Sequence, residues 1–89
     1  MMDVKLKTPA EDKRFEMDWS GRLDAGETVS SSSWVVSSEL TSLGANIASP
    51  LTSTKIGGGV EGSRHLVTNQ ITTSAGNTLE ETFVVSVEK

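Results

Sequence analysis

The chain has 89 residues, no cysteine, two tryptophans, two phenylalanines and a formal net charge of −4. A chain of this length forms at most one domain and buries roughly 60–65% of its unfolded surface, so we expect a thin core. Without cysteine, neither a disulfide nor a thiolate-bound zinc ion can stabilise the fold. Because the charged residues are scattered along the chain, the sequence predicts no nucleic-acid partner, and the negative net charge predicts no attraction to an anionic membrane.

The N-terminal segment differs in composition from the rest of the chain. Residues 1–12 are polar and contain Pro9, which predicts a flexible or extended N-terminal arm followed by one domain over residues 13–89. The arm has no apolar run of signal-peptide length, and no window approaches the roughly 18 apolar residues of a membrane span. We therefore expect the protein to be made and kept in a cytoplasm, unless it leaves as part of something larger.

Two strands are predicted in the first half of the domain. Phe15, Met17 and Trp19 alternate with acidic residues, which indicates one buried face. After two turn signals in the sequence SGRLDAGETV, a second strand is expected over residues 27–36. Its register is open, because either choice of face points serines inward, where small side chains would make room for the ring of Trp34.

Short apolar pieces separated by glycine, serine and proline fill the middle of the chain. We expect strands over residues 40–43, 46–49 and 51–56, with Pro50 at an edge or a break. The segment Gly57–Gly59 is predicted to be a loop, because three glycines lose too much conformational entropy in a strand.

The last third of the chain predicts a long β-hairpin. Residues 64–73 and 79–88 alternate in hydrophobicity, and residues 74–77 between them tolerate positive φ. No segment has the apolar stripe of a helix, and about seven short strands at intervals of about 8–12 residues are typical of a β-sandwich. The sequence therefore predicts an all-β fold, an immunoglobulin-like β-sandwich of about seven strands. The residues predicted to form its core or corners are Trp19, Trp34, His65, Val67, Asn69, Ile71, Phe83 and Val85.

His65 is the only histidine and the first candidate for chemistry, as a general base or a metal ligand. Both roles need partners, such as the serine and carboxylate of a catalytic triad, and the sequence shows none at a recognisable spacing. We therefore favour a structural histidine that makes one hydrogen bond near a corner of the sandwich.

Asn69 is a polar residue at an unexpected place, because it shares a predicted inward face with Val67 and Ile71. A buried amide has to satisfy its donors and its acceptor. We expect its side chain to fix a neighbouring loop by hydrogen bonds to the backbone, rather than to bind a ligand.

The carboxylates do not predict a catalytic or metal site. The adjacent pairs Glu11-Asp12 and Glu80-Glu81 point to opposite faces of a strand, whereas a glycosidase pair has to converge across a cleft. Asp18, Asp24 and Glu27 lack the dense ligand spacing of calcium loops. The sequence IGGGVEGSR lacks the lysine and the following helix of a phosphate-binding loop. We therefore expect no catalytic residue, no metal and no cofactor.

Several short motifs follow one another in a recognisable order and spacing: Asp18-Trp19, Leu23, Gly26-Glu27-Thr28, the segment Ser31 to Val36 around Trp34, Val67 to Thr73 with Asn69, and Gly76. Over about residues 7–89 this pattern resembles the fiber-tail adaptor proteins of tailed bacteriophages, which are small immunoglobulin-like virion proteins. That family usually has a tyrosine at the position of His65, where its hydroxyl group anchors a corner of the sandwich. We expect a ring nitrogen of His65 to replace this hydroxyl.

The resemblance implies a non-enzymatic structural protein of a phage virion, made in the cytoplasm of the host bacterium. It would lie at the neck or tail, dock fibers or neighbouring tail proteins through strand edges and loops, and occur in many copies in a symmetric assembly. Residues 1–12 would then become ordered on assembly. Two alternatives stay open. A free-standing module that binds carbohydrate or a host surface would show exposed aromatic side chains, and a small hydrolase would need a convergent site of serine, histidine and acid.

Overall fold

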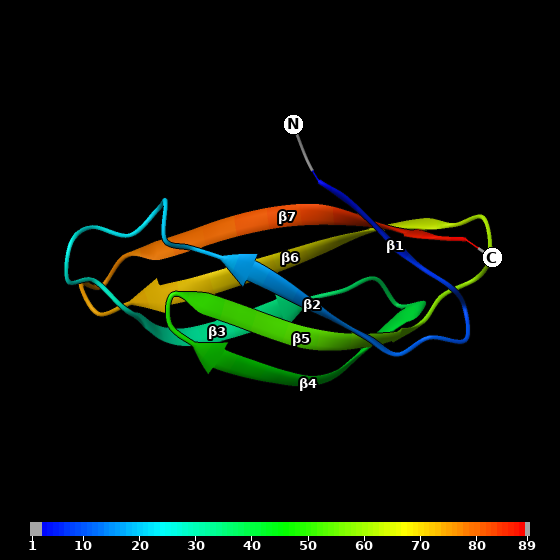
Figure 1. The fold of residues 1–89 in the computed structure, drawn as a ribbon, viewed down its shortest axis with the longest axis horizontal. Helices are drawn as coiled ribbons and strands as arrows, with labels where there is room; N and C mark the ends of the chain where they lie inside the picture. Colours follow the sequence, from blue (N-terminus) through cyan, green and yellow to red (C-terminus); the bar gives the residue numbers. More distant parts are fainter. Residues whose placement is uncertain (1–2, 89) are drawn as a thin grey trace.

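The fold is all-β, with seven strands in two sheets (Figure 1). It was obtained as a computed structural model, which describes residues 3–88. One sheet has four strands in the order β1-β7-β6-β3, and the other has three in the order β2-β5-β4. The strands are β1 (Val4–Lys7), β2 (Lys13–Asp18), β3 (Val29–Val35), β4 (Leu40–Ala48), β5 (Leu51–Gly58), β6 (Arg64–Thr73) and β7 (Thr78–Val87).

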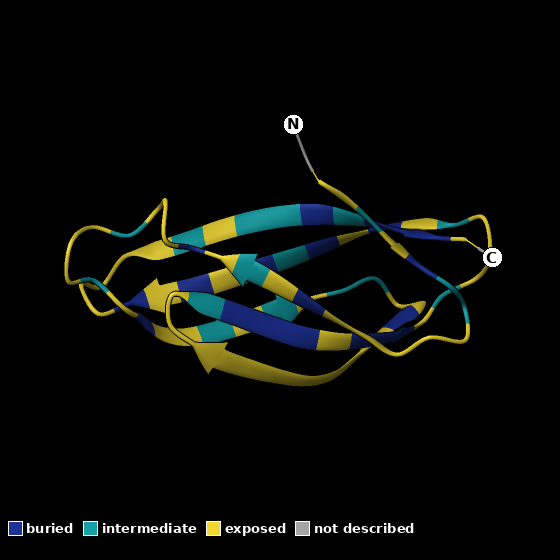
Figure 2. Cartoon of the chain, in the orientation of Figure 1, coloured by how far each residue is buried: buried dark blue, intermediate teal, exposed yellow. Residues whose placement is uncertain are grey.

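The core lies between the two sheets, because side chains from both pack against each other there. Phe15 of β2 and Ile56 of β5 belong to the same buried cluster as Val67 of β6 and Phe83 of β7. The rings of Phe15 and Phe83 have centroids 5.8 Å apart, within the range of favourable aromatic pairs. Figure 2 shows the resulting alternation of buried and exposed residues along β6. Burial of each such side chain stabilises the fold by about 1.5–3 kcal/mol.

The predicted hairpin is confirmed, and it forms the centre of the four-stranded sheet. Strands β6 and β7 pair antiparallel from Arg64 beside Ser86 to Thr72 beside Thr78. Gly76, in the turn that joins them, has φ of +83°, a conformation that glycine adopts without strain. The length of this hairpin follows from two uninterrupted runs of alternating residues, since each keeps one face toward the core.

The open register of the second predicted strand is explained by a β-bulge in β3. Val29 lies beside Thr73 of β6, whereas Ser31 lies beside Thr72, so an extra residue of β3 is accommodated at Ser30. The bulge reverses the alternation, and Val29 is therefore buried although it differs in parity from the half-buried Trp34. No strict alternation could have placed both side chains inward.

The middle of the chain differs from the prediction at two places. Residues 40–48 form one continuous strand, β4, instead of two, because a bulge between Ser42 and Ala45 absorbs the interruption at Gly44. The prediction of a loop at Gly57–Gly59 is also wrong in part, since Gly57 and Gly58 are the last residues of β5. These glycines are needed for close approach rather than for flexibility. A Cβ at Gly57 would collide with the side chain of Asp12, and one at Gly58 would lie 2.8 Å from the carbonyl oxygen of Glu39.

Part of the predicted arm belongs to the sheet. Val4–Lys7 forms β1, which runs parallel to β7. The side chain of Lys7 is 2% exposed, and its Nζ donates to the carbonyl oxygens of Gly58 at 2.5 Å and Thr8 at 2.8 Å. This segment is therefore bonded to both sheets. Residues 1–2 of the predicted arm lie outside the described residues.

Candidate docking surfaces

The eight residues predicted as core or corner residues lie between the sheets or at their ends. Trp34 is half-buried; it packs edge-on against Phe83, with ring centroids 6.2 Å apart, and its Nε1 is buried without a hydrogen-bond partner in the described residues. The other seven are at most 7% exposed. They are Trp19, His65, Val67, Asn69, Ile71, Phe83 and Val85.

Asn69 is the centre of a buried polar cluster that connects the two sheets. Its Oδ1 accepts hydrogen bonds from Trp19 Nε1 at 3.1 Å and Thr52 Oγ1 at 2.5 Å. Its Nδ2 donates to Ser32 Oγ at 2.8 Å and to the carbonyl oxygen of Ser33 at 2.9 Å. Only one of the four bonds is to backbone, and it reaches a neighbouring strand, β3, rather than a loop. The cluster links β3 and β6 of one sheet to β5 and the end of β2 in the other.

His65 lies at the start of β6 and makes two hydrogen bonds rather than one. Its Nδ1 is 2.6 Å from Ser37 Oγ, and its Nε2 is 2.9 Å from Ser63 Oγ. Because Ser63 Oγ donates to the carbonyl oxygen of Val60, it accepts from Nε2–H, which leaves Nδ1 to accept from Ser37. Glu39 Oε1 is 3.6 Å from the same Nε2, beyond hydrogen-bond distance.

This arrangement places a serine, a histidine and an acid together, but its geometry fits a structural hydrogen-bond network better than a catalytic triad. In a triad the acid holds the ring nitrogen opposite the nucleophile, and here Ser63 occupies that nitrogen. The imidazole is also only 7% exposed, which keeps a substrate from reaching it. His65 therefore connects the loop before β4 to the loop before β6.

The acidic residues considered as calcium ligands do not converge, and within residues 3–88 no group of three or more histidine, cysteine or acidic residues is placed to hold a metal. Glu27 instead connects two loops. Its carboxylate accepts hydrogen bonds from the backbone N–H of Asp24 at 2.9 Å, from Asn77 Nδ2 at 3.0 Å and from Thr73 Oγ1. The bond from the Asp24 backbone, followed by those from Thr73 and Asn77, lowers the pKa of Glu27. The motif Gly26-Glu27-Thr28 thus anchors the β6–β7 turn.

The remaining acidic pairs are also structural. Glu11 accepts from the backbone N–H of Thr8 at 2.8 Å, and this bond is the main cause of its lowered pKa. Glu81 forms an exposed ion pair with Arg22. Glu81 also lines a cavity of about 380 Å³ with Asp3, Glu16 and Asp18, but its own carboxylate is paired with Arg22.

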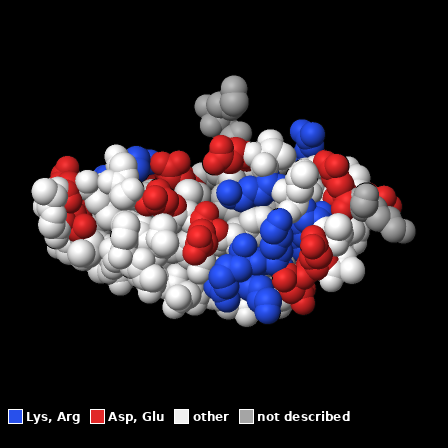
Figure 3. All heavy atoms as spheres, viewed as in Figure 1, with Lys and Arg blue, Asp and Glu red and all other residues white. Residues whose placement is uncertain are grey.

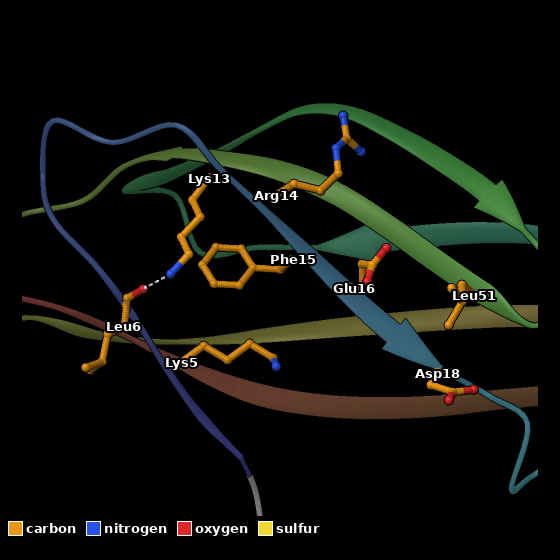
Figure 4. Close-up of a pocket in the computed structure, with 8 residues that line it drawn as sticks. All are labelled: Lys5, Leu6, Lys13, Arg14, Phe15, Glu16, Asp18 and Leu51. Carbon is orange, nitrogen blue, oxygen red and sulfur yellow. Dashed lines mark hydrogen bonds between the residues drawn. The ribbon is translucent and has the colours of Figure 1, made fainter.

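The two edges β1 and β2 lie on one lateral side of the molecule, and a groove of about 750 Å³ runs between them (Figure 4). Lys13 spans its narrow end, where its Nζ donates to the carbonyl oxygen of Leu6 at 3.1 Å. The ring of Phe15 lies beneath, 5.7 Å from this ammonium group. Glu16 and Asp18 line the other end, where the strands diverge.

Basic residues gather around this groove, although they are scattered in the sequence (Figure 3). Lys5 and Lys13 line it, and Arg14 of β2 lies directly beside Lys55 of β5. We call these four residues the basic patch. The sequence predicted no nucleic-acid partner because the basic residues are scattered along the chain. The fold gathers four of them into one patch, so this reason no longer holds. Pairing of β2 with β5 and the reversal of the chain between β1 and β2 create the patch.

The other lateral side is formed by the edges β3 and β4, and neither strand contains a charged residue. Eight of the nine residues of β4 are exposed, among them Leu43 at 49% and Ile47 at 41%. One edge of β4 pairs with β5, and the other is not paired with any described strand. Natural edge strands are usually protected by charge, proline, a bulge or cover. Strand β4 has a bulge between Ser42 and Ala45 but no charged residue or proline inside the strand.

Together these features define a small β-protein that offers two open sides, one charged and one uncharged, for contact with other molecules. Among residues 3–88, no helix is long and apolar enough to cross a membrane. Residues 7–86 match the profile of a protein family described as "Podophage GP4 fiber-tail adaptor protein gp77". The chain belongs to this family, as its motifs predicted, and is therefore a structural tail adaptor of a phage that interacts with other tail or fiber proteins in the virion. No curated protein matches the chain.

Proposed function

We propose that this chain is a non-enzymatic adaptor at the neck or tail of a phage virion, made in the host cytoplasm, which docks fiber or neighbouring tail proteins through strand edges and loops. It acts in many copies within a symmetric assembly. The observation that carries the proposal is the edge of β4 that is paired with no described strand, in a strand that is long, uncharged and exposed. A partner strand that adds to this edge satisfies backbone groups and covers Leu43 and Ile47.

We further propose that the two sheets form an immunoglobulin-like sandwich. In that fold one sheet contains the third, sixth and seventh strands, with a tryptophan on the third and a conserved tyrosine near the start of the sixth. The order β7-β6-β3, with Trp34 on β3 and His65 at the start of β6, supports the assignment. In this interpretation His65 holds its corner through Ser37 and Ser63 in place of a tyrosine hydroxyl.

The alternative of a carbohydrate-binding module has little support. Sugar-binding surfaces present aromatic rings to solvent, and here Phe15, Trp19 and Phe83 are at most 4% exposed. Trp34 is half-buried against Phe83. The chain offers no aromatic platform on which a sugar ring can stack.

The test is a charge placed on the β4 edge of the phage-encoded protein. We expect Ile47→Lys to leave the melting temperature nearly unchanged, because the side chain is already 41% exposed, and to prevent incorporation into phage particles. Leu66→Lys is the matched control, since Leu66 is 56% exposed but lies on β6, an interior strand of its sheet. Quantitative mass spectrometry of purified particles measures incorporation. Equal amounts of both variants in the particles would contradict docking at this edge.

A further inference from the structure

We propose that the groove between β1 and β2 binds an extended acidic segment of a neighbouring protein. The proposal rests on the proposed function only in taking that protein to be part of the virion. It concerns the opposite side of the molecule from β4, so the two can fail separately.

The charges of the basic patch are not directly paired. Within residues 3–88, no member of the patch lies within ion-pairing distance of a carboxylate, although Lys13 lines a cavity with Glu11, and Lys5 lines another with Glu16 and Asp18. Arg14 and Lys55 are cross-strand neighbours on the same face, and like charges in this position destabilise a sheet. The fold therefore maintains an unfavourable pair that an anionic partner would neutralise.

The backbone of β1 has groups on both of its edges. On one edge, the carbonyl oxygens of Asp3 and Lys7 accept hydrogen bonds from Val84 of β7 and from Glu88, the residue after β7. The carbonyl oxygen of Leu6, between them, accepts instead from Lys13 across the groove. Alternate residues of β1 thus direct their backbone groups into the groove, and β2 likewise has one edge without a partner strand. A segment that enters in an extended conformation can pair with these groups.

Charge and apolar surface are distributed unevenly along the groove. Lys13 lies at one end, Glu16 and Asp18 line the other, and the side chain of Lys5 extends between them (Figure 4). Val4 and Leu6 of β1 are more than half exposed. The ligand that fits is an extended segment with carboxylates in one half and alternating apolar side chains throughout. Acidic residues over its whole length would meet Glu16 and Asp18.

A fluorescent peptide of about nine residues, Glu-Val-Glu-Val-Thr-Val-Thr-Val-Thr, is the probe. We expect it to bind the full chain with a Kd between about 10 μM and about 1 mM. The affinity should fall severalfold between about 50 mM and about 500 mM salt, because the attraction is electrostatic. In NMR spectra of labelled protein, amide shifts should concentrate in β1 and β2 and spare β4.

Two control peptides separate charge from strand pairing. Replacing both glutamates by lysine should abolish binding. Replacing the threonines by proline keeps the carboxylates but removes backbone donors, and it should weaken binding at least about tenfold. Equal binding of the proline peptide would overturn the strand-pairing proposal, and so would tighter binding of a single-stranded DNA decamer.

The decisive variant is Lys55→Glu, because Lys55 lies beside Arg14 of the groove lining and makes no hydrogen bond or ion pair in the described structure. We therefore expect the replacement to leave the fold intact. We expect about a tenfold loss of affinity at low salt, and a larger loss when Lys13→Glu is added. Arg64→Glu, a reversal of the same size on an exposed residue of β6, should leave the affinity unchanged. No binding by the wild-type chain at about 1 mM peptide, or equal losses for Lys55→Glu and Arg64→Glu, would overturn the proposal.

Discussion

The two lateral sides of the molecule both expose strand edges, but they differ in the charge that these edges carry. Each exposes two strand edges, and an exposed edge is a template for pairing with another chain. On the β1/β2 side the edges carry Lys5, Lys13, Arg14, Glu16 and Asp18, and an ammonium group already bonds one carbonyl oxygen across the groove. On the β3/β4 side the strands carry serine, threonine, alanine and a few exposed aliphatic residues.

Under the two docking proposals, the charged side selects partners by their charge, whereas the uncharged side accepts a strand with little regard to charge. Charges at an edge repel wrong partners and select those of opposite sign. An edge without charges relies on backbone pairing and apolar cover. Two dissimilar surfaces of this kind would allow the proposed adaptor to bind two different partners.

The largest loss of stability is expected for a substitution in the buried polar cluster of Asn69, which connects the charged side to the uncharged side. Asn69→Leu removes an amide that bonds Trp19, which follows β2, and Ser32 and Ser33 of β3. We expect a loss of about 3 kcal/mol or more, because several buried groups lose their partner at once. Urea-induced unfolding measures it. Gln70→Leu, on the exposed face of the same strand, is the control. A loss of stability below about 1 kcal/mol for Asn69→Leu would show that the cluster does not hold the two sides together.

A smaller loss of stability, confined to the charged side, is expected for Lys7→Met. The substitution keeps most of the aliphatic stem but removes the hydrogen bonds to Gly58 and Thr8, which should cost about 1–3 kcal/mol. Hydrogen exchange should accelerate in β1 more than in β6. Lys5→Met, at the neighbouring and less buried lysine, should leave the exchange of β1 nearly unchanged. Uniform acceleration over both sheets would mean that β1 is not a separable element.

Much of this architecture was predictable because alternation is a strong signal when it is long. The β6–β7 hairpin followed from runs of ten residues in each strand, and Phe15, Met17 and Trp19 correctly indicated the inward face of β2. The bulges in β3 and β4 were not predictable, because a single inserted residue breaks the period of two that reveals a strand.

Other features depend on contacts between residues distant in the sequence. Gly57 looked like part of a loop because only the approach of Asp12 explains why it is glycine in a strand. The burial of Lys7 could not be predicted, because its two acceptors are backbone carbonyl groups, which have no sequence signature. The basic patch required the pairing of Arg14 with Lys55, which are 41 positions apart in the printed sequence. The serines that bond His65 came from two loops, and its single expected bond was therefore an underestimate.

On the uncharged side, truncation should have almost no effect on folding. Ile47→Ala removes a side chain that is 41% exposed, so we expect a loss of at most about 0.5 kcal/mol in thermal unfolding. Leu43→Ala, at a similarly exposed position in β4, should behave in the same way. A loss above about 2 kcal/mol for either would mean that these side chains serve the core of the free protein, and it would weaken their assignment to a docking surface.

Acid should affect β1, β2 and the loop before β3 more than β4. Hydrogen bonds from the backbone of Thr8, Ser20 and Asp24 lower the pKa values of Glu11, Asp18 and Glu27, respectively. A lowered pKa in the folded state gives stability that is present above the ordinary carboxyl pKa of about 4 and is lost as the pH falls through the folded value. NMR spectra recorded from neutral pH to about pH 2 should show changes in these segments first. Earlier changes in β4 would reverse the expected order.

The parallel pairing of β1 with β7 has a mechanical consequence. Tension applied between residues 3 and 88 pulls these neighbouring strands in opposite directions along their length, so their hydrogen bonds are loaded in shear. Bonds loaded in shear have to break together, whereas bonds at the end of a hairpin can open one after another. The domain therefore resists being stretched between residues 3 and 88 more strongly than a domain whose terminal strands form a hairpin.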